Sequence, residues 1–91
     1  FMFRIWGQIF KNNKVINDYV ACIDDYTMTR TRKVYTALED ICYEFDLSKP
    51  IWLKANQDDF IKHARTRFTQ DNFIEGIDFD YLDFRVIEED Y

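Results

Sequence analysis

The residues with the clearest potential for chemistry are Asp59, His63 and Arg67, which recur every four positions in a stretch that we expect to be helical. This spacing places side chains on one face of a helix, so a carboxylate, the only imidazole of the chain and a guanidinium would lie together. Such a group can bind an anion or orient a general base. The alternative is a solvated helix face whose cations complement the helix dipole near its C-terminal end.

A binding pocket built on this face would draw on neighbouring polar and aromatic residues. The candidates that complete it are Arg65 and Asp71, with a rim at Trp52 or Tyr81. This arrangement predicts a small-molecule or anion-binding domain. An enzymatic role stays open within this hypothesis, because a histidine flanked by charged groups can transfer protons.

Other kinds of site are disfavoured by the residue types and their spacing. A single histidine and the separated Cys22 and Cys42 provide neither the C-x-x-C nor the H-x-x-x-H spacing that presents metal ligands together. Gly7 and Gly76 are isolated, whereas phosphate-binding loops need several glycines. Cys42 falls on an apolar stripe, where a buried thiol without a base is inert. We therefore predict no metal site, no cofactor and no catalytic residue.

The composition predicts one ordered domain spanning residues 1–91. Nine phenylalanines, six tyrosines and two tryptophans contribute to a hydrophobic content of 47%, well above that of chains that stay disordered. The net charge of −5 disfavours nucleic acid as a partner. No apolar run approaches the ~18 residues of a membrane span, and Arg4 and Gln8 interrupt the apolar start of the chain, unlike a signal peptide. A cytoplasmic protein with no membrane partner is the expectation.

The first part of the chain is predicted to form a β-hairpin. Met2 to Phe10 and Val15 to Ile23 alternate in polarity around Asn12 and Asn13, and asparagine tolerates the left-handed backbone of a two-residue hairpin turn. Continuous pairing from this turn would form an apolar face from three pairs: Ile9 with Ile16, Ile5 with Val20, and Phe3 with Cys22.

The second face of this hairpin is also predicted to be apolar, because Trp6, Phe10, Val15 and Tyr19 would lie on it. A hairpin with one solvated face should be polar there. Either another part of the chain covers these side chains, or they form an interaction surface. The resulting hypothesis is a non-catalytic protein-interaction module or homodimer that uses these four residues.

Two helices are expected after the hairpin. The first runs from about Thr29 to Phe45, with apolar residues recurring at three and four. Lys49 precedes Pro50, which disfavours helical backbone at that lysine and separates the helices. The short apolar piece at residues 51–53 is a brief strand or a buried connector, and a second helix from Gln57 to about Arg67 follows, with Asn56 as its N-cap.

A final strand is predicted from Phe79 to Ile87, because its residues alternate in polarity. The predicted fold is therefore α+β: an N-terminal β-hairpin, two helices and a C-terminal strand, forming an antiparallel sheet with helices packed on one face. The final strand can pair with residues 2–10 or with residues 15–23, and we favour the former. Phe3, Phe45, Phe60 and Phe84 are assigned to the core.

Several segments resemble small uncharacterised proteins of Gram-positive anaerobic bacteria. They are Ile41-Cys42-Tyr43-Glu44-Phe45-Asp46-Leu47 through Lys49-Pro50-Ile51-Trp52-Leu53, and Lys62-His63-Ala64-Arg65-Thr66-Arg67-Phe68 through Phe79-Asp80-Tyr81-Leu82. This resemblance implies a cytoplasmic bacterial domain without an assigned activity. It therefore transfers no catalytic role to any residue.

Overall fold

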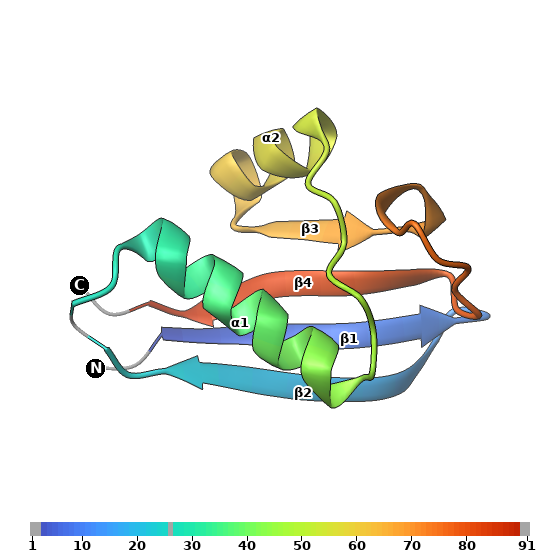
Figure 1. The fold of residues 1–91 in the computed structure, drawn as a ribbon, viewed down its shortest axis with the longest axis horizontal. Coiled ribbons are helices and arrows are strands. Elements are labelled where there is room, and N and C mark those ends of the chain that lie inside the picture. The colour runs from blue at the N-terminus through green and yellow to red at the C-terminus, as the bar shows by residue number, and fades with distance from the viewer. Residues whose placement is uncertain (1–2, 26, 90–91) are drawn as a thin grey trace.

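The computed structural model describes residues 3–25 and 27–89, so the predicted first strand residue, Met2, lies outside the described residues. Its elements are β1 (Phe3–Lys11), β2 (Lys14–Ile23), α1 (Arg30–Glu44), α2 (Lys54–His63), β3 (Arg65–Phe68), the short 3-10 helix η1 (Gln70–Asn72) and β4 (Tyr81–Glu88). The strands form one antiparallel sheet in the order β2-β1-β4-β3 (Figure 1). The predicted α+β class is confirmed, as is the pairing of the last strand with the first.

The hairpin turn lies at Asn12 and Asn13, as predicted, with φ angles of 54° and 64°. The pairing beyond the turn differs from the prediction. Phe10 pairs with Val15, but Ile9 pairs with Asn17, because the strand bulges at this point. A bulge places one extra residue on one strand, so every later partner on β2 is shifted by one.

Because of this shift, the β2 residues beyond the bulge lie on the opposite face of the sheet from the predicted one. The buried partners of Ile5 and Phe3 are Ala21 and Ile23, whereas the predicted partners Val20 and Cys22 are exposed on the other face. A one-residue slip moves side chains to the opposite side of a sheet. The predicted pairs of Ile9, Ile5 and Phe3 are therefore wrong.

Helix α1 lies across one face of the sheet (Figure 1) and agrees closely with the prediction. Thr29 caps its first turn by accepting a hydrogen bond from the Arg32 amide. The helix buries a continuous apolar stripe, formed by Val34, Ala37, Leu38, Ile41 and Cys42. This stripe packs over β1 and β2 and fixes the face of the sheet that contains the core.

Helix α2 is shifted toward the N-terminus relative to the prediction. It begins after Leu53, and Ala64, with a φ of 55°, ends it. The following residues form β3, a strand that the sequence interpretation placed inside the helix. Thr66 and Phe68 are buried while Arg67 is exposed, so an alternating strand pattern was mistaken for the basic end of a helix.

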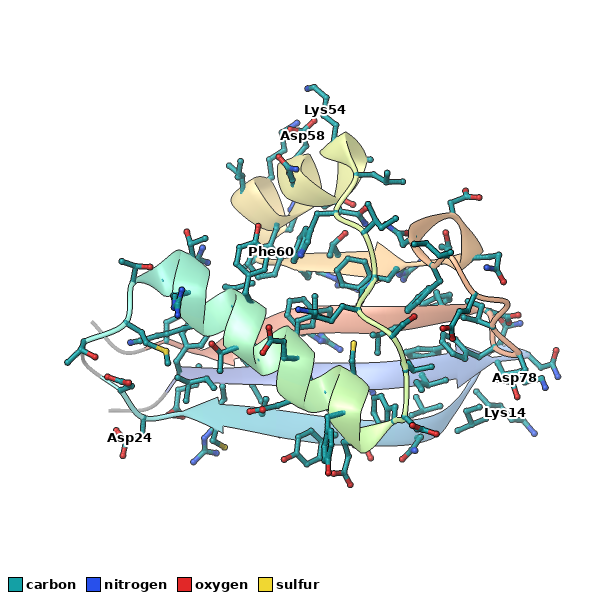
Figure 2. All side chains as sticks on the ribbon, viewed as in Figure 1. Lys14, Asp24, Lys54, Asp58, Phe60 and Asp78 are labelled. Atoms are coloured by element: carbon teal, nitrogen blue, oxygen red, sulfur yellow. The ribbon has the colours of Figure 1, made fainter. Side chains whose placement is uncertain are left out.

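The core is completed by an aromatic cluster beneath α2. Trp52, in the connector between the helices, meets Phe60, Phe68 and Phe84 edge to face at centroid distances of 5.6, 5.1 and 6.1 Å. Figure 2 shows Phe60 on the side of α2 that faces α1. Of the four predicted core phenylalanines, three are buried and Phe45 packs against the core while partly exposed. No helix in the described ranges is long and apolar enough to span a membrane.

Candidate functional site

One face of the sheet faces away from both helices, and we call it the open face. Both helices pack on the opposite side, because Ile41 of α1 approaches Gly7, and Phe60 of α2 contacts the Phe84 that pairs with Gly7. The open face is formed by alternate strand residues: Arg4, Trp6, Gln8 and Phe10 of β1, Val15, Asp18, Val20 and Cys22 of β2, Tyr81, Asp83, Arg85 and Glu88 of β4, and Arg65 and Arg67 of β3.

Aromatic rings on the open face contact one another and the guanidinium groups of neighbouring arginines. The rings of Phe10 and Tyr81 are stacked with centroids 4.9 Å apart. The guanidinium of Arg67 lies over the ring of Tyr81 at 4.6 Å, and that of Arg85 lies over Trp6 at 5.3 Å. Cation–π contacts of this kind contribute about 0.5–1 kcal/mol each at exposed sites, so these rings and cations hold one another in place.

Polar contacts bind the same side chains into a network. The indole Nε1 of Trp6 donates to Asp18 Oδ2 at 3.1 Å. Arg65 Nη2 lies 3.7 Å from Asp83 Oδ2, although Asp83 is only 3% exposed. Asp83 Oδ1 is buried and has no hydrogen-bond partner among the described residues. A buried carboxylate is costly unless it is paired, so Arg65 stabilises Asp83.

The open face has a charge opposite to that of the chain. It contains Arg4, Arg65, Arg67 and Arg85 against Asp18, Asp83 and Glu88, an excess of one positive charge in a protein of net charge −5. None of its residues is a lysine. Arginine and aromatic residues are enriched in the cores of protein interfaces, whereas lysine is depleted there.

The predicted interaction residues are divided between two surfaces. Trp6, Phe10 and Val15 lie on the open face, as the sequence indicated. Tyr19 pairs with Gly7 rather than with Trp6, which turns its side chain to the helix-bearing side of the sheet. The reason is the bulge in β2, which reverses the orientation of the residues between the bulge and Ile23.

The predicted anion-binding residues meet in a depression of about 670 Å³ between α2 and β3. Asp59, His63, Arg65 and Arg67 line it, together with Thr66, which the sequence interpretation did not include. The helix contributes only the first two residues, because both arginines come from the edge strand. The sequence signal that could have identified Thr66 is the strand-like alternation in which Thr66 and Phe68 share one face and Arg67 lies on the other.

The remaining members of that hypothesis lie elsewhere. Asp71 belongs to η1 and does not line the depression. Trp52 is part of the core cluster, and Tyr81 lies beneath Arg67 on the open face. Within the depression, Thr66 Oγ1 lies 3.5 Å from Asp59 Oδ2, and His63 is exposed. Two cations beside one carboxylate leave a modest positive excess, suited to a carboxylate or phosphate group.

A buried asparagine closes the outer edge of β3 next to this depression. Asn56 Nδ2 donates to the Arg67 carbonyl oxygen and to Thr66 Oγ1, both at 2.9 Å. Its Oδ1 accepts from the Leu53 amide at 3.1 Å and from Asn72 Nδ2 at 2.7 Å. Asn56 therefore joins α2, β3 and η1. It lies in the first turn of α2 and accepts from the amide of the N-cap residue Leu53, rather than being the N-cap itself as predicted.

The two cysteines differ in their surroundings. Cys22 is exposed on β2, and Cys42 is buried in the stripe of α1. Burial raises the pKa of the Cys42 thiol to about 11, with Lys49 exerting a smaller opposing effect. No group of three metal-ligating side chains occurs within residues 3–25 and 27–89.

Comparisons of the chain with protein-family models, with curated proteins and with solved structures gave no significant match. The resemblance to small bacterial proteins therefore stays a prediction, and the function has to be inferred from the surfaces described above.

Proposed function

We propose that this domain is a non-catalytic protein-interaction module that binds an acidic surface of a partner protein on its open face. The observation that supports this proposal is the set of residue types that meet there. Trp6, Tyr81 and four of the six arginines lie on the one sheet face that neither helix covers. Tryptophan, tyrosine and arginine are the residues that dominate binding hot spots.

The ring contacts favour a protein partner over a nucleic acid. Single-stranded nucleic acids bind by stacking bases on free ring faces. Here the ring of Tyr81 is already in contact with Phe10 and Arg67, and the ring of Trp6 is in contact with Arg85. The overall charge of −5 also opposes a polyanionic backbone. A partner that contributes carboxylates and apolar side chains can use the arginines without displacing these contacts.

The depression between α2 and β3 supports a second candidate function, the binding of a small anion. The observation behind it is that Asp59, His63, Arg65 and Arg67 converge there. Both arginines also belong to the open face, so one experiment has to separate the two candidates. Bacterial origin and a cytoplasmic location remain expectations from the sequence.

Titrations monitored by the fluorescence of Trp6 test the proposal. A Trp52→Phe background removes the second indole, whose buried Nε1 has no hydrogen-bond partner in the part of the chain that the structure describes. The probes are polyglutamate, single-stranded oligothymidine and inorganic phosphate. We expect polyglutamate to change the Trp6 emission and to bind less tightly as salt is added, because exposed charges are screened.

Matched substitutions supply the control. Arg67→Ala should weaken polyglutamate binding by about tenfold, the factor that corresponds to 1.4 kcal/mol, and it leaves the contact of Arg65 with the buried Asp83 intact. Arg32→Ala removes the same charge from an exposed position outside the open face and should leave binding unchanged. Tighter binding of oligothymidine than of polyglutamate would overturn the proposal in favour of a nucleic acid. Phosphate binding that shifts the His63 imidazole resonances without changing the Trp6 emission would support the second candidate instead.

A further inference from the structure

The edge strand β2 exposes apolar side chains along most of its length. All of its residues from 14 to 20 are exposed, and four are large and apolar: Val15, Ile16, Tyr19 and Val20, at 45%, 56%, 36% and 37%. The strand is hydrogen-bonded to β1 on one side only, so the outward N–H and C=O groups of its free side are available to another strand. Such an edge normally carries several charges or is covered, because it otherwise pairs with another chain.

The opposite edge of the sheet is covered in this way. β3 has only four residues, and the side chain of Asn56 donates a hydrogen bond to the Arg67 carbonyl oxygen at its outer edge. Helix α2 lies directly beside it (Figure 1). The same domain therefore blocks one edge with a buried side chain and a helix, while the ten-residue edge of β2 has no covering element among the described residues.

We propose that β2 pairs with β2 of a second copy of this chain, in antiparallel orientation, to form one continuous eight-stranded sheet. The charges at the two ends of the strand favour a second copy in this orientation. Lys11 and Lys14 flank the turn, and Asp24 and Asp25 follow the other end. Figure 2 shows Lys14 and Asp24 at opposite ends of β2. Antiparallel pairing brings the basic end of each copy to the acidic end of the other, whereas parallel pairing would bring like charges together.

The register follows from symmetry. A twofold axis perpendicular to the sheet keeps each side chain on its own face, so the residue at the axis faces its own copy. The longest overlaps of β2 place either Asp18 or Tyr19 at the axis. Two aspartates directly opposite one another destabilise a sheet, whereas an aromatic pair stabilises it by roughly 0.2–1 kcal/mol. The geometry therefore points to Tyr19 facing Tyr19, with Asn17 opposite Ala21.

Disulfide trapping tests this register. In a Cys22→Ser background, Tyr19→Cys should form a covalent dimer on mild oxidation, because the two Cβ atoms face each other across the axis. The native Cys42 does not interfere, since it is buried. Ile61→Cys, at an 82% exposed position on α2, is the control for random collisions and should stay monomeric. Cross-linking that is stronger at Asp18→Cys than at Tyr19→Cys would overturn the proposed register.

Sedimentation equilibrium tests the pairing itself. The wild type should be a dimer at tens of micromolar, and Tyr19→Lys should be a monomer with an unchanged circular dichroism spectrum, because two ammonium groups would meet at the axis. Tyr43→Lys, at an 87% exposed position on α1, should remain a dimer. A monomeric wild type would overturn the proposal, and so would a dimer that Trp6→Asp disrupts and Tyr19→Lys does not. Binding of polyglutamate to the open face does not depend on this result, so the two proposals can fail separately.

Discussion

Gly7 determines how closely α1 approaches the sheet. A Cβ atom built at this position would lie 2.6 Å from Ile41 Cγ2 and 3.1 Å from Ile41 Cδ1, and Ile41 is fully buried. Contacts this short require Ile41 or the helix to move, and overpacking in a core costs about 1–3 kcal/mol. The glycine is therefore needed for space rather than for an unusual backbone angle.

Gly7→Ala should lower the free energy of unfolding by about 1–3 kcal/mol, as measured by denaturant titration. Gly76→Ala is the matched control, because no atom of residues 3–25 and 27–89 lies within 4 Å of a Cβ at that position. It should be neutral or slightly stabilising, since alanine restricts the unfolded chain. Equal stability of the two variants would show that Ile41 adopts another rotamer at little cost.

Cys42 should make the stability of the protein depend on alkaline pH. Burial raises the pKa of this thiol from 9.0 to about 11 in the folded chain. Between these two values the unfolded chain has lost the proton while the folded chain retains it, so unfolding releases a proton and stability falls as pH rises. Below pH 9 the thiol is protonated in both states and contributes no pH dependence.

Comparison of the wild type with Cys42→Ala isolates this effect, because the tyrosines and lysines that also titrate at alkaline pH are common to both proteins. The difference in unfolding free energy between the two should be constant below pH 9 and should shrink as pH approaches 11. A difference that stays constant over the whole range would contradict the shifted pKa. In the native protein, a thiol reagent should modify the exposed Cys22 and should reach Cys42 only on unfolding.

At the scale of single residues, the sequence was sufficient where a local physical preference decides the structure. Asn12 and Asn13 tolerate positive φ, which predicted the turn. The bulge beside Ile9 leaves no such signal, because the alternation of β2 reads equally well in either register. The position of Tyr19 could therefore not be predicted.

Among the structural elements, the Asn56 network should be sensitive to a change of one atom. Asn56 is 5% exposed and uses its amide as a donor toward Arg67 and Thr66, and its oxygen as an acceptor from Leu53 and Asn72. The donor and the acceptor of the Asn56 amide group therefore both have hydrogen-bond partners. A buried group that loses its partner costs about 1–3 kcal/mol, and more when it is charged.

Asn56→Asp should therefore destabilise the domain by at least about 2 kcal/mol, because a carboxylate cannot donate to the Arg67 carbonyl. The measurement is thermal or chemical unfolding near neutral pH. Asn17→Asp, at an exposed position on β2, makes the same chemical change and should shift stability by less than about 0.5 kcal/mol. Similar losses in both variants would mean that added negative charge, rather than the network, controls stability.

The second helix and β3 show why element boundaries were harder to predict than element types. Asn56 has the residue type of an N-cap, and the bases that follow suit the end of a helix. In the structure, Ala64 adopts a left-handed conformation that ends α2 without a glycine, and the next four residues pair with β4. Tertiary pairing thus overrode a charge pattern that is typical of a helix.

At the scale of the whole molecule, the aromatic content of the chain divides between a core and an open face. The sequence predicted a surplus of rings around Trp6 and Phe10, and both lie on the open face. It did not predict the group of arginines beside them, because Arg4, the neighbours Arg65 and Arg67, and Arg85 lie in three separate parts of the chain and only the order β1-β4-β3 brings them together. The net charge of −5 conceals this local excess.

The pairing of β1 with β4 also determines how the domain should respond to mechanical force. Arg4, near the start of β1, is paired with Glu88, at the end of β4, and both strands lie in the middle of the sheet. A pull applied at Phe3 and Glu89 would load the perpendicular hydrogen bonds of this antiparallel pair one after another. The sheet should therefore unzip at low force along its centre, separating the β2-β1 hairpin from β4 and β3.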